Sequence, residues 1–384
     1  MSFIPYSCQQ IEDEDIAAVV AVLKSDFLTQ GPAITAFEQE FAAKHDAAFG
    51  IAVCNATAAL HIACLALDIG PGSLVWTSPN SFVASANCAR YVGADVDFVD
   101  IDPVMRNMSL EALTVKLEAA DAAGRLPNLL IPVDFAGLPC DMIEMRALAD
   151  RYGFKIVEDA SHAAGATYHG RPVGVHADIC VFSFHAVKVV TTAEGGLLAT
   201  NDPKIAERLE LLRSHGVTRK PELLENPSEG GWYYEQVTLG YNYRMTDLQA
   251  ALGSSQLSRI DAMQARRIAH ADRYDELFAD MPLKLPARAN DRVSAWHLYA
   301  IELGDDAKVS RADVFAALRA AQIGANVHYI PIHRQPDYER LGFKRGDFPA
   351  SEHYYDRAIS LPLFPRMTSE QQERVVSVIR DALS

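Results

Sequence analysis

The sequence lacks a long apolar run and a basic leader, and it has few cysteines for its length. Its 384 residues include six cysteines, widely separated and without a C-x-x-C pair, so neither structural zinc nor a disulfide framework is expected. No basic residues precede the first apolar run, which ends at Lys24 and is far shorter than the roughly 20 residues of a membrane span. These absences predict a cytoplasmic protein with reduced thiols and no membrane anchor.

Positive charge is also scarce. Lysine and arginine number 35 against 50 aspartates and glutamates, which gives a formal net charge of −15. Binding to a nucleic-acid backbone or to an anionic membrane needs clustered positive charge, so the composition argues against both partners. An apolar share of 49% with 22% charged residues is typical of a globular protein, and the length favours two or three domains.

Several common catalytic motifs are missing. The chain has no GxxxxGK[ST] loop, no HExxH pair, no GxGxxG after a strand and no GxSxG elbow. Nucleotide hydrolysis, zinc-dependent proteolysis, dinucleotide binding and serine hydrolysis therefore lose their usual support. We expect no metal site.

What the first half does contain is a regular alternation of short apolar runs and helix-sized segments. The runs occupy residues 50–54, 73–78, 95–100, 128–133, 154–159 and 178–184. Their spacing of about 20 to 30 residues leaves room for crossover helices, which predicts an α/β domain with a mainly parallel sheet. Near the N-terminus, Ile16, Val20 and Leu23 recur at helical spacing and predict the apolar face of an amphipathic helix. In such sheets ligands bind beyond the carboxyl ends of the strands.

The character of the chain changes after Met245. A long helical pattern is followed by Pro282 and Pro286, and then by capping boxes at Ser310 and at Thr368. We expect a large domain over residues 1–260 and a smaller α+β domain over residues 261–384. Residues 216–231 are polar and rich in proline and glycine, which predicts a long surface loop.

The most informative stretches are 155-KIVEDASHAAGA-166 and 181-VFSFHAVKVVTTAEGG-196. Asp159 follows one predicted strand, and Lys188 comes shortly after another. A lysine in this place can bond covalently to a cofactor aldehyde, while a carboxylate opposite a pyridine nitrogen keeps that nitrogen protonated. Taken singly, each residue is also explained as a solvated surface lysine or a turn aspartate. Their joint context favours cofactor chemistry.

The segments EDASHA, FSFHxxK, TTxEGG and GYNYRMTDLQAALG resemble sugar aminotransferases of the DegT/DnrJ/EryC1/StrS family. The match runs in order from residues 28–32 (LTQGP) to residues 328–333. The resemblance implies an enzyme with an α/β, aspartate-aminotransferase-like fold (the type I pyridoxal phosphate fold), in which a mostly parallel mixed sheet is joined to a smaller C-terminal α+β domain. It also implies pyridoxal 5′-phosphate (PLP) as the cofactor.

Within the family, LTQGP, 131-IPVDFAGLPCDM-142 and SFH are most similar to the transaminase of pseudaminic acid biosynthesis. That similarity implies amination of C4 of a UDP-linked 4-keto-6-deoxy-N-acetyl-L-sugar, with L-glutamate as the amino donor. Two alternatives stay open: an aminotransferase for a dTDP- or GDP-linked ketosugar, and a catalytically silent regulatory protein on the same fold. A related branch of dehydratases replaces the lysine by histidine, so Lys188 favours transamination.

The resemblance also implies a role for individual residues. Lys188 would bind the cofactor and move the proton, Asp159 would pair with the ring nitrogen, and His162 would lie near the ring. The other cofactor contacts would be Phe82 stacking on the ring, Ala56, Thr57 and Ser183 at the phosphate, and Asn242 reaching that phosphate from the partner subunit of a homodimer. Candidate substrate contacts are Thr29, His185, Arg244, His328, Tyr329 and His333, for which a structural role is the alternative.

The chain departs from the family pattern at two places. Ala186 stands where the family often has proline, and Ala193 where it often has glycine. Neither change removes a reacting group, although losing the proline could loosen the loop before Lys188.

Overall fold

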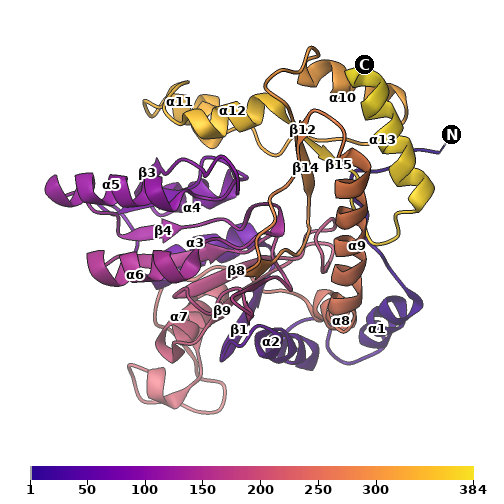
Figure 1. Cartoon of the computed structure of the whole chain (residues 1–384). Coiled ribbons are helices and arrows are strands. Elements are labelled where there is room, and N and C mark those ends of the chain that lie inside the picture. Colours follow the sequence, from indigo (N-terminus) through magenta and orange to yellow (C-terminus); the bar gives the residue numbers. More distant parts are fainter. Residues whose placement is uncertain (1) are drawn as a thin grey trace.

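A seven-stranded sheet forms the centre of the computed structural model, which describes residues 2–384 (Figure 1). Its strands are β1 (Phe49–Val53), β2 (Leu74–Thr77), β3 (Asp95–Phe98), β4 (Leu129–Ile131), β5 (Lys155–Asp159), β8 (Ile179–Ser183) and β9 (Gly196–Thr200), in the order β1-β9-β8-β5-β4-β2-β3. Strand β9 runs antiparallel to both of its neighbours, and all the other pairs are parallel. The predicted mixed, mostly parallel sheet is confirmed.

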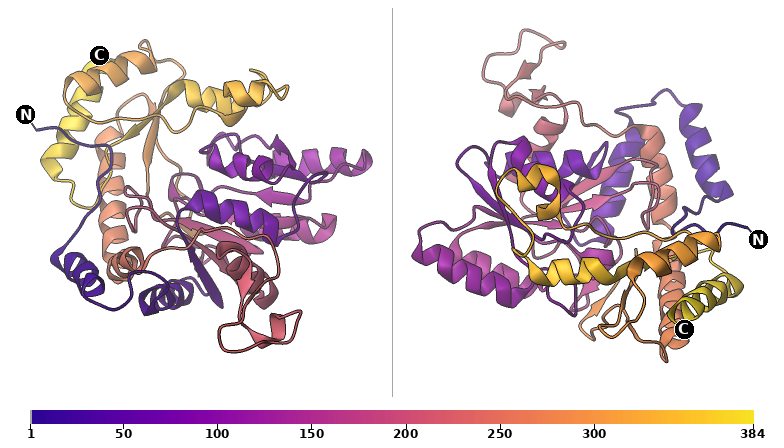
Figure 2. Two further views of the ribbon diagram at one scale, coloured as in Figure 1. Left: turned by 180° about the vertical axis from the view of Figure 1, so that it is seen from behind. Right: turned by 90° about the horizontal axis from the view of Figure 1, so that it is seen from above.

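Helices cover both faces of this sheet (Figures 1 and 2). One face packs against α3 (Ala56–Ala66), α4 (Ala84–Tyr91) and α7 (Pro203–Arg213), and the other against α2 (Pro32–Lys44), α5 (Leu110–Ala122), α6 (Met142–Tyr152) and α8 (Asp247–Leu257). Every residue of β8 and β9 is buried as a result. Burial on both faces explains why the strands appear in the sequence as continuous apolar runs rather than as alternating patterns.

A second unit is built around the C-terminal part of the chain, at the top of Figure 1. Its antiparallel sheet contains β12 (Leu283–Lys284), β14 (Tyr299–Leu303) and β15 (Ala358–Leu361), and it packs with α9 (Ile260–Phe278), α10 (Arg311–Ala320) and α13 (Ser369–Leu383). Ile4, from the opposite end of the chain, is buried in the same apolar cluster. The division at residue 260 stays a prediction, but this separate cluster supports it.

The predicted helix starts in this unit are confirmed. Ser310 opens α10 and Thr368 opens α13, each with a reciprocal capping box. Helix α10 ends at Ala320. Gly324 lies beyond this end, against the N-terminal segment, where a Cβ would come within 2.7 Å of the backbone nitrogen of Tyr6.

Shorter elements complete the chain. They are β6 (Thr167–Tyr168) and β7 (Arg171–Pro172) with β13 (Arg292–Val293), the helices α11 (Pro336–Glu339) and α12 (Pro349–Arg357), and the turns η1 (Phe135–Gly137) and η3 (Ile332–Arg334). Residues 216–231 lie mostly in a projecting loop, as predicted, which contains β10 (Val217–Thr218) and η2 (Pro221–Leu223) and returns through β11 (Glu235–Gln236) (Figure 1). Within residues 2–384, no helix is long and apolar enough to cross a membrane.

The N-terminal helix α1 (Asp13–Leu23) differs from expectation. It forms where predicted, but Ile16 and Leu23 on its apolar side are 55% and 56% exposed. The residue that it buries is Asp15, whose carboxylate accepts hydrogen bonds from Ser255 and Gln256 on α8 and from Arg259 just after it. A polar network therefore anchors α1 to α8, and its apolar side stays uncovered within this chain.

Candidate active site

A cavity of about 730 Å³ opens beyond the carboxyl ends of the parallel strands. Strand β5 ends at Asp159, β8 ends at Ser183, and α3 begins at Ala56 just after β1. Ten residues predicted from the sequence line this one cavity: Ala56, Thr57, Phe82, Asp159, His162, Ser183, His185, Lys188, His328 and Tyr329. The topology thus gathers side chains that are as much as 273 positions apart, from Ala56 to Tyr329.

Asp159 is 4% exposed and is held on both oxygens. The hydroxyl of Ser85 donates a hydrogen bond to its Oδ2 over 2.7 Å, and the backbone N–H of Ser161 donates to its Oδ1 over 3.1 Å. Donors of this kind stabilise the ionised carboxylate. The cavity therefore contains an oriented anion.

Lys188 lies in the loop between β8 and β9 and is half-buried. Its burial lowers the pKa to about 8, and this effect outweighs the nearby negative charge of Asp159, which acts in the opposite direction. The loop is held by hydrogen bonds from the N–H of Lys188 to the carbonyl of His185 and from that of Thr192 to Phe184. Ala193 has a φ of +67°. This left-handed conformation explains why glycine suits that position.

His162 is a buried, uncharged histidine. The backbone N–H of Ala136 donates to its Nδ1 over 3.3 Å, which leaves the ring proton on Nε2, 3.2 Å from the hydroxyl oxygen of Tyr329. Burial holds the pKa of His162 well below its usual value, and the charge of Lys188 adds to this effect. Burial also raises the pKa of Tyr329. Both groups are therefore neutral hydrogen-bonding residues near physiological pH.

The start of α3 provides a place for an anion. The side chain of Asn55 accepts a hydrogen bond from the N–H of Ala58, so the amides of Ala56 and Thr57 remain for a ligand in the cavity. Gly196 packs directly against this turn, and a Cβ there would lie 2.7 Å from the backbone nitrogen of Ala56. The close approach of β9 to the helix start therefore requires glycine at this position.

Thr29, Asn242 and Arg244 do not line the cavity of their own chain. Thr29 pairs with Thr246 in an isolated bridge, Asn242 is exposed, and Arg244 lines a separate cavity of about 250 Å³. Arg244 donates there to the hydroxyl of Ser214 over 2.8 Å. One chain alone therefore does not bring these three side chains to Lys188.

His333 also lies outside the cavity lining. Its side chain is 0% exposed, its Nε2 lies 2.9 Å from a carboxylate oxygen of Glu352, and its ring packs against Phe348. Ile330 and Gln335 on either side of it line the cavity, but His333 itself does not. Its contact with the sugar therefore stays a prediction that this buried position does not support.

Other cavity residues were not predicted. They are Tyr6, Ser81, Ser85, Ser161, Glu194, His297, Asn326 and Gln335 among the polar ones. His297 is buried, its ring centre lies 4.4 Å from that of His162, and burial holds its pKa well below the usual value. Ser161 and Glu194 stand inside the motifs EDASHA and TTxEGG, which could have pointed to them. The quoted motifs do not include the others, which reach the cavity through contacts between distant segments. Within residues 2–384, no arginine lines the cavity.

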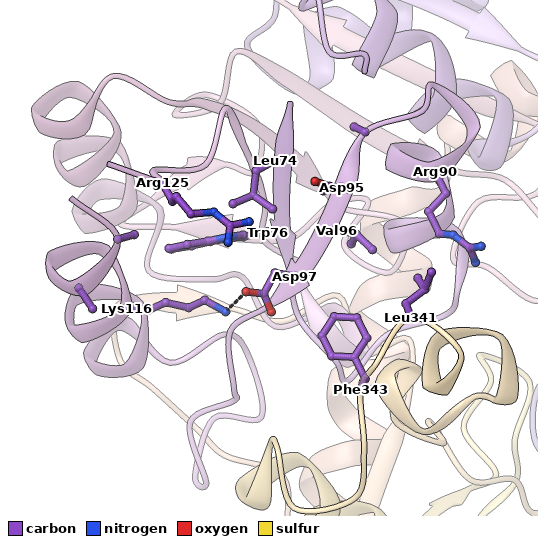
Figure 3. Close-up of a pocket in the computed structure, with 13 residues that line it drawn as sticks. Leu74, Trp76, Arg90, Asp95, Val96, Asp97, Lys116, Arg125, Leu341 and Phe343 are labelled. Atoms are coloured by element: carbon purple, nitrogen blue, oxygen red, sulfur yellow. Dashed lines mark ion pairs between the residues drawn. The ribbon is translucent and has the colours of Figure 1, made fainter. Parts of the chain in front are cut away.

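A second large cavity, of about 620 Å³, lies beside the edge strand β3 (Figure 3). Its lysine, Lys116, is ion-paired with Asp97 over 2.7 Å and lies 4.8 Å from the ring centre of Trp76. The amine of Lys116 is therefore engaged by an ion pair and an aromatic ring. The two cavities therefore differ in the surroundings of their lysines, since no salt bridge is found for Lys188 in the part of the chain that the structure describes.

The fold, the half-buried lysine and the strand-end carboxylate define the class of PLP-dependent aminotransferases of fold type I. Residues 9–380 match the model of the DegT/DnrJ/EryC1/StrS aminotransferase family, and the chain belongs to that family. It is thus a PLP-dependent sugar aminotransferase, as its sequence motifs predicted.

Individual proteins that are similar to this chain support the same family. The spore coat polysaccharide biosynthesis protein SpsC of Bacillus subtilis is 41% identical, with 99% of this chain and 97% of SpsC covered. Spr1654 of Streptococcus pneumoniae, which is described as a sugar aminotransferase, superposes in its PLP form with a TM-score of 0.88. The two chains are 30% identical over 100% of each. PseC of Helicobacter pylori, an aminotransferase involved in the biosynthesis of pseudoaminic acid, superposes with a TM-score of 0.90 at 29% identity, over 100% of this chain and 99% of PseC.

The cavity residues fit this cofactor. An amine of lowered pKa suits the aldehyde, and the fixed anion of Asp159 suits a protonated ring nitrogen. The amides at the start of α3 suit the phosphate. Phe82 is 59% exposed and lines the cavity, where a flat ring would cover it.

Proposed function

We propose that this enzyme aminates C4 of a nucleotide-linked 4-keto-6-deoxy sugar, with L-glutamate as the amino donor and a UDP-linked N-acetyl-L-sugar as the favoured substrate. The observation that carries the proposal is the meeting of Lys188 and Asp159 in one cavity beside an anion-binding helix start. The similarity to PseC and the motifs LTQGP, IPVDFAG and SFH support the choice of sugar.

When bound, the cofactor supplies an electron sink that allows an amino group to be exchanged for a ketone. Asp159 would face its ring nitrogen and keep that nitrogen protonated, with Phe82 against the ring and His162 near the ring oxygen. Ala56, Thr57 and Ser183 would hold the phosphate. Asp159 and Ser183 end strands of one sheet, and the other residues lie in the segments that follow its strands. This arrangement would fix the reacting centre relative to Lys188.

Lys188 would then act as the acid and base of the reaction. Moving a proton to C4 of the sugar requires a group that both accepts and releases protons near neutral pH, and a pKa of about 8 meets that need. Burial excludes water from the amine and lowers its affinity for the proton. His185, His328 and Tyr329 line the same cavity and would orient the sugar.

A second subunit would complete the site. The cofactor phosphate, the sugar diphosphate and the glutamate carboxylates are anions, yet Lys188 is the one lysine or arginine lining the cavity within residues 2–384. We propose a homodimer in which Asn242 of one chain reaches the phosphate bound by the other. Thr29 and Arg244 lie close to Asn242 in the fold and would serve the partner's cavity in the same way. The uncovered apolar side of α1 supports an interface between copies.

Two alternatives are distinguished by experiment. A dTDP- or GDP-linked ketosugar would use the same chemistry with a different base. A catalytically silent protein on this fold would not need both Lys188 and Asp159, and both are present.

The test offers UDP-, dTDP- and GDP-linked 4-ketosugars with glutamate to the holoenzyme and follows the release of 2-oxoglutarate. We expect the fastest release with the UDP-linked N-acetyl sugar. Faster release with a dTDP or GDP sugar would show that the substrate carries a different nucleotide. If no ketosugar supports release, the proposed function is wrong.

A further inference from the structure

The segment that carries Phe82 also carries two buried serines. Ser81 and Ser85 lie four positions apart, at the turn into α4, and they are 4% and 1% exposed. The N–H of Ser85 donates to the carbonyl of Phe82, so the chain turns here and brings the two hydroxyl oxygens to 2.7 Å from each other. The same turn leaves Phe82 exposed to the cavity. One short segment thus presents both an aromatic face and a hydroxyl pair.

The direction of these hydrogen bonds follows from the chemistry. Oγ of Ser85 lies 2.7 Å from Oδ2 of Asp159, and an ionised carboxylate only accepts, so Ser85 is the donor. A hydroxyl has one proton to donate. Ser81 must therefore donate to Ser85, which gives a chain of hydroxyls that runs from Ser81 through Ser85 to Asp159. In such a chain each bond polarises the next and strengthens it.

We infer that Ser85, with Ser81 behind it, is a positioning residue for the reaction, because it fixes the direction in which Asp159 presents its carboxylate to the cavity. The inference rests on the proposed role of Asp159 opposite the cofactor ring nitrogen. The bond from the N–H of Ser161 holds Oδ1, and the bond from Ser85 holds Oδ2, so together they stop the carboxylate from rotating. Asp159 can then face a ring nitrogen without reorganisation.

Removing the Ser85 hydroxyl should have an effect that is specific to the cofactor. The anion would lose a charge-assisted bond and would draw the proton that it shares with the ring nitrogen more strongly towards itself. The ring would then withdraw fewer electrons from its bond to Lys188. The pH at which the cofactor absorbance changes would therefore move upward.

The experiment compares Ser85→Ala, Ser85→Thr and Ser81→Ala in the holoenzyme. For Ser85→Ala we expect a dissociation constant for PLP about tenfold higher and an absorbance midpoint about half a pH unit higher. We also expect a lower kcat with little change in the KM of the sugar. Ser81→Ala should move the PLP dissociation constant and the absorbance midpoint in the same direction by a smaller amount. Ser85→Thr keeps the hydroxyl and should restore them.

Ser255 offers a matched control. Its hydroxyl donates to the buried carboxylate of Asp15 over 2.6 Å, on α8 and outside the cavity. Ser255→Ala removes the same kind of bond, so it should lower thermal stability while leaving the PLP dissociation constant and the absorbance midpoint unchanged.

Three results would overturn the inference: wild-type values for Ser85→Ala, a Ser85→Thr variant that behaves like Ser85→Ala, or equal effects of Ser85→Ala and Ser255→Ala on the cofactor. Asp159→Asn separates this inference from the proposed function. If Asp159→Asn is inactive while Ser85→Ala behaves as wild type, the serine inference alone fails. If Asp159→Asn keeps normal turnover and absorbance, the proposed role of Asp159 fails first.

Discussion

The hydroxyl oxygen of Tyr329 lies 3.2 Å from Nε2 of His162, a contact that joins the C-terminal unit to the loop after β5. Because Nδ1 of His162 accepts from the backbone of Ala136, the ring donates through Nε2, and Tyr329 is the acceptor. The proton of the Tyr329 hydroxyl is then available for a group in the cavity. The two parts of the chain thus meet through a pair of neutral groups at the reacting centre.

Tyr329→Phe should lower kcat/KM for the ketosugar by roughly tenfold, because it leaves the buried N–H of His162 without its acceptor and removes a donor from the cavity. Steady-state kinetics with the preferred ketosugar check this. Tyr338→Phe is the control, since that hydroxyl donates to Asn87 over 2.7 Å outside the cavity. Normal kinetics for Tyr329→Phe, or equal losses in both variants, would contradict the assignment.

The lowered pKa of Lys188 predicts the pH dependence of cofactor attachment. Only a neutral amine attacks an aldehyde, so the rate at which the apoenzyme takes up PLP should rise with pH and level off above about 8, near the pKa of Lys188. Asp159→Asn should lower this midpoint, because the carboxylate favours the charged amine. Stopped-flow absorbance measures the rate. A rate still rising at pH 10 would show an ordinary lysine.

A buried acid pair behind Asp159 predicts how stability varies with pH. Glu158 and Asp134 are both fully buried, and each has a carboxyl oxygen without a hydrogen-bond partner. Burial raises the pKa of Asp134 to about 7 and that of Glu158 well above its usual value. The folded protein therefore binds more protons than the unfolded chain between about pH 4 and pH 7. The free energy of unfolding should fall as pH rises through this window, and it should keep falling above the window wherever Glu158 still holds its proton in the folded protein.

Glu158→Gln should remove much of the stability loss that rising pH causes. An amide donates to Asp134 without a titrating proton, so the variant should be more stable than wild type by roughly 1–3 kcal/mol at pH 8 and similar to it at pH 5. Denaturant unfolding of the holoenzyme at both pH values checks this. Glu118→Gln, at an exposed position of α5, controls for the lost charge. Parallel pH profiles for Glu158→Gln and wild type would contradict the prediction.

Shared sites in a homodimer predict complementation between two defective variants. Asn242→Ala and Lys188→Ala should each have little activity alone. In a hybrid dimer one site carries both defects and the other carries neither, so random reassortment of equal amounts should restore about a quarter of wild-type activity. Activity after co-refolding measures this. If the mixture stays as inactive as its components, Asn242 does not act across an interface.

The sequence predicted the fold where the pattern is local. Continuous apolar runs marked six of the seven strands of the main sheet, and the capping boxes marked the starts of α10 and α13. The antiparallel placement of β9 between β1 and β8 was not predictable, because it depends on pairing with strands far away in sequence. The exposure of Ile16 was not predictable either, because periodicity marks the apolar face of a helix but does not say which segment covers it.

The site follows the same rule. Lys188 and Asp159 were predicted because each follows a strand and stands in a recognisable motif. Ser85 was missed because its partner Asp159 is 74 positions away, and His297 because it reaches the cavity from the C-terminal unit. The burial of His333 against Glu352 was not predictable, because residues that are neighbours in a motif can point to different places in the fold.

The most direct test of the central claim is Lys188→Ala, assayed for 2-oxoglutarate release and for the yellow absorbance of the lysine-bound cofactor. Lys44→Ala, which removes an ion pair with Asp261 at the surface, is the control and should keep both signals. Our account predicts that Lys188→Ala loses both signals while remaining folded. Turnover that survives in Lys188→Ala would contradict it.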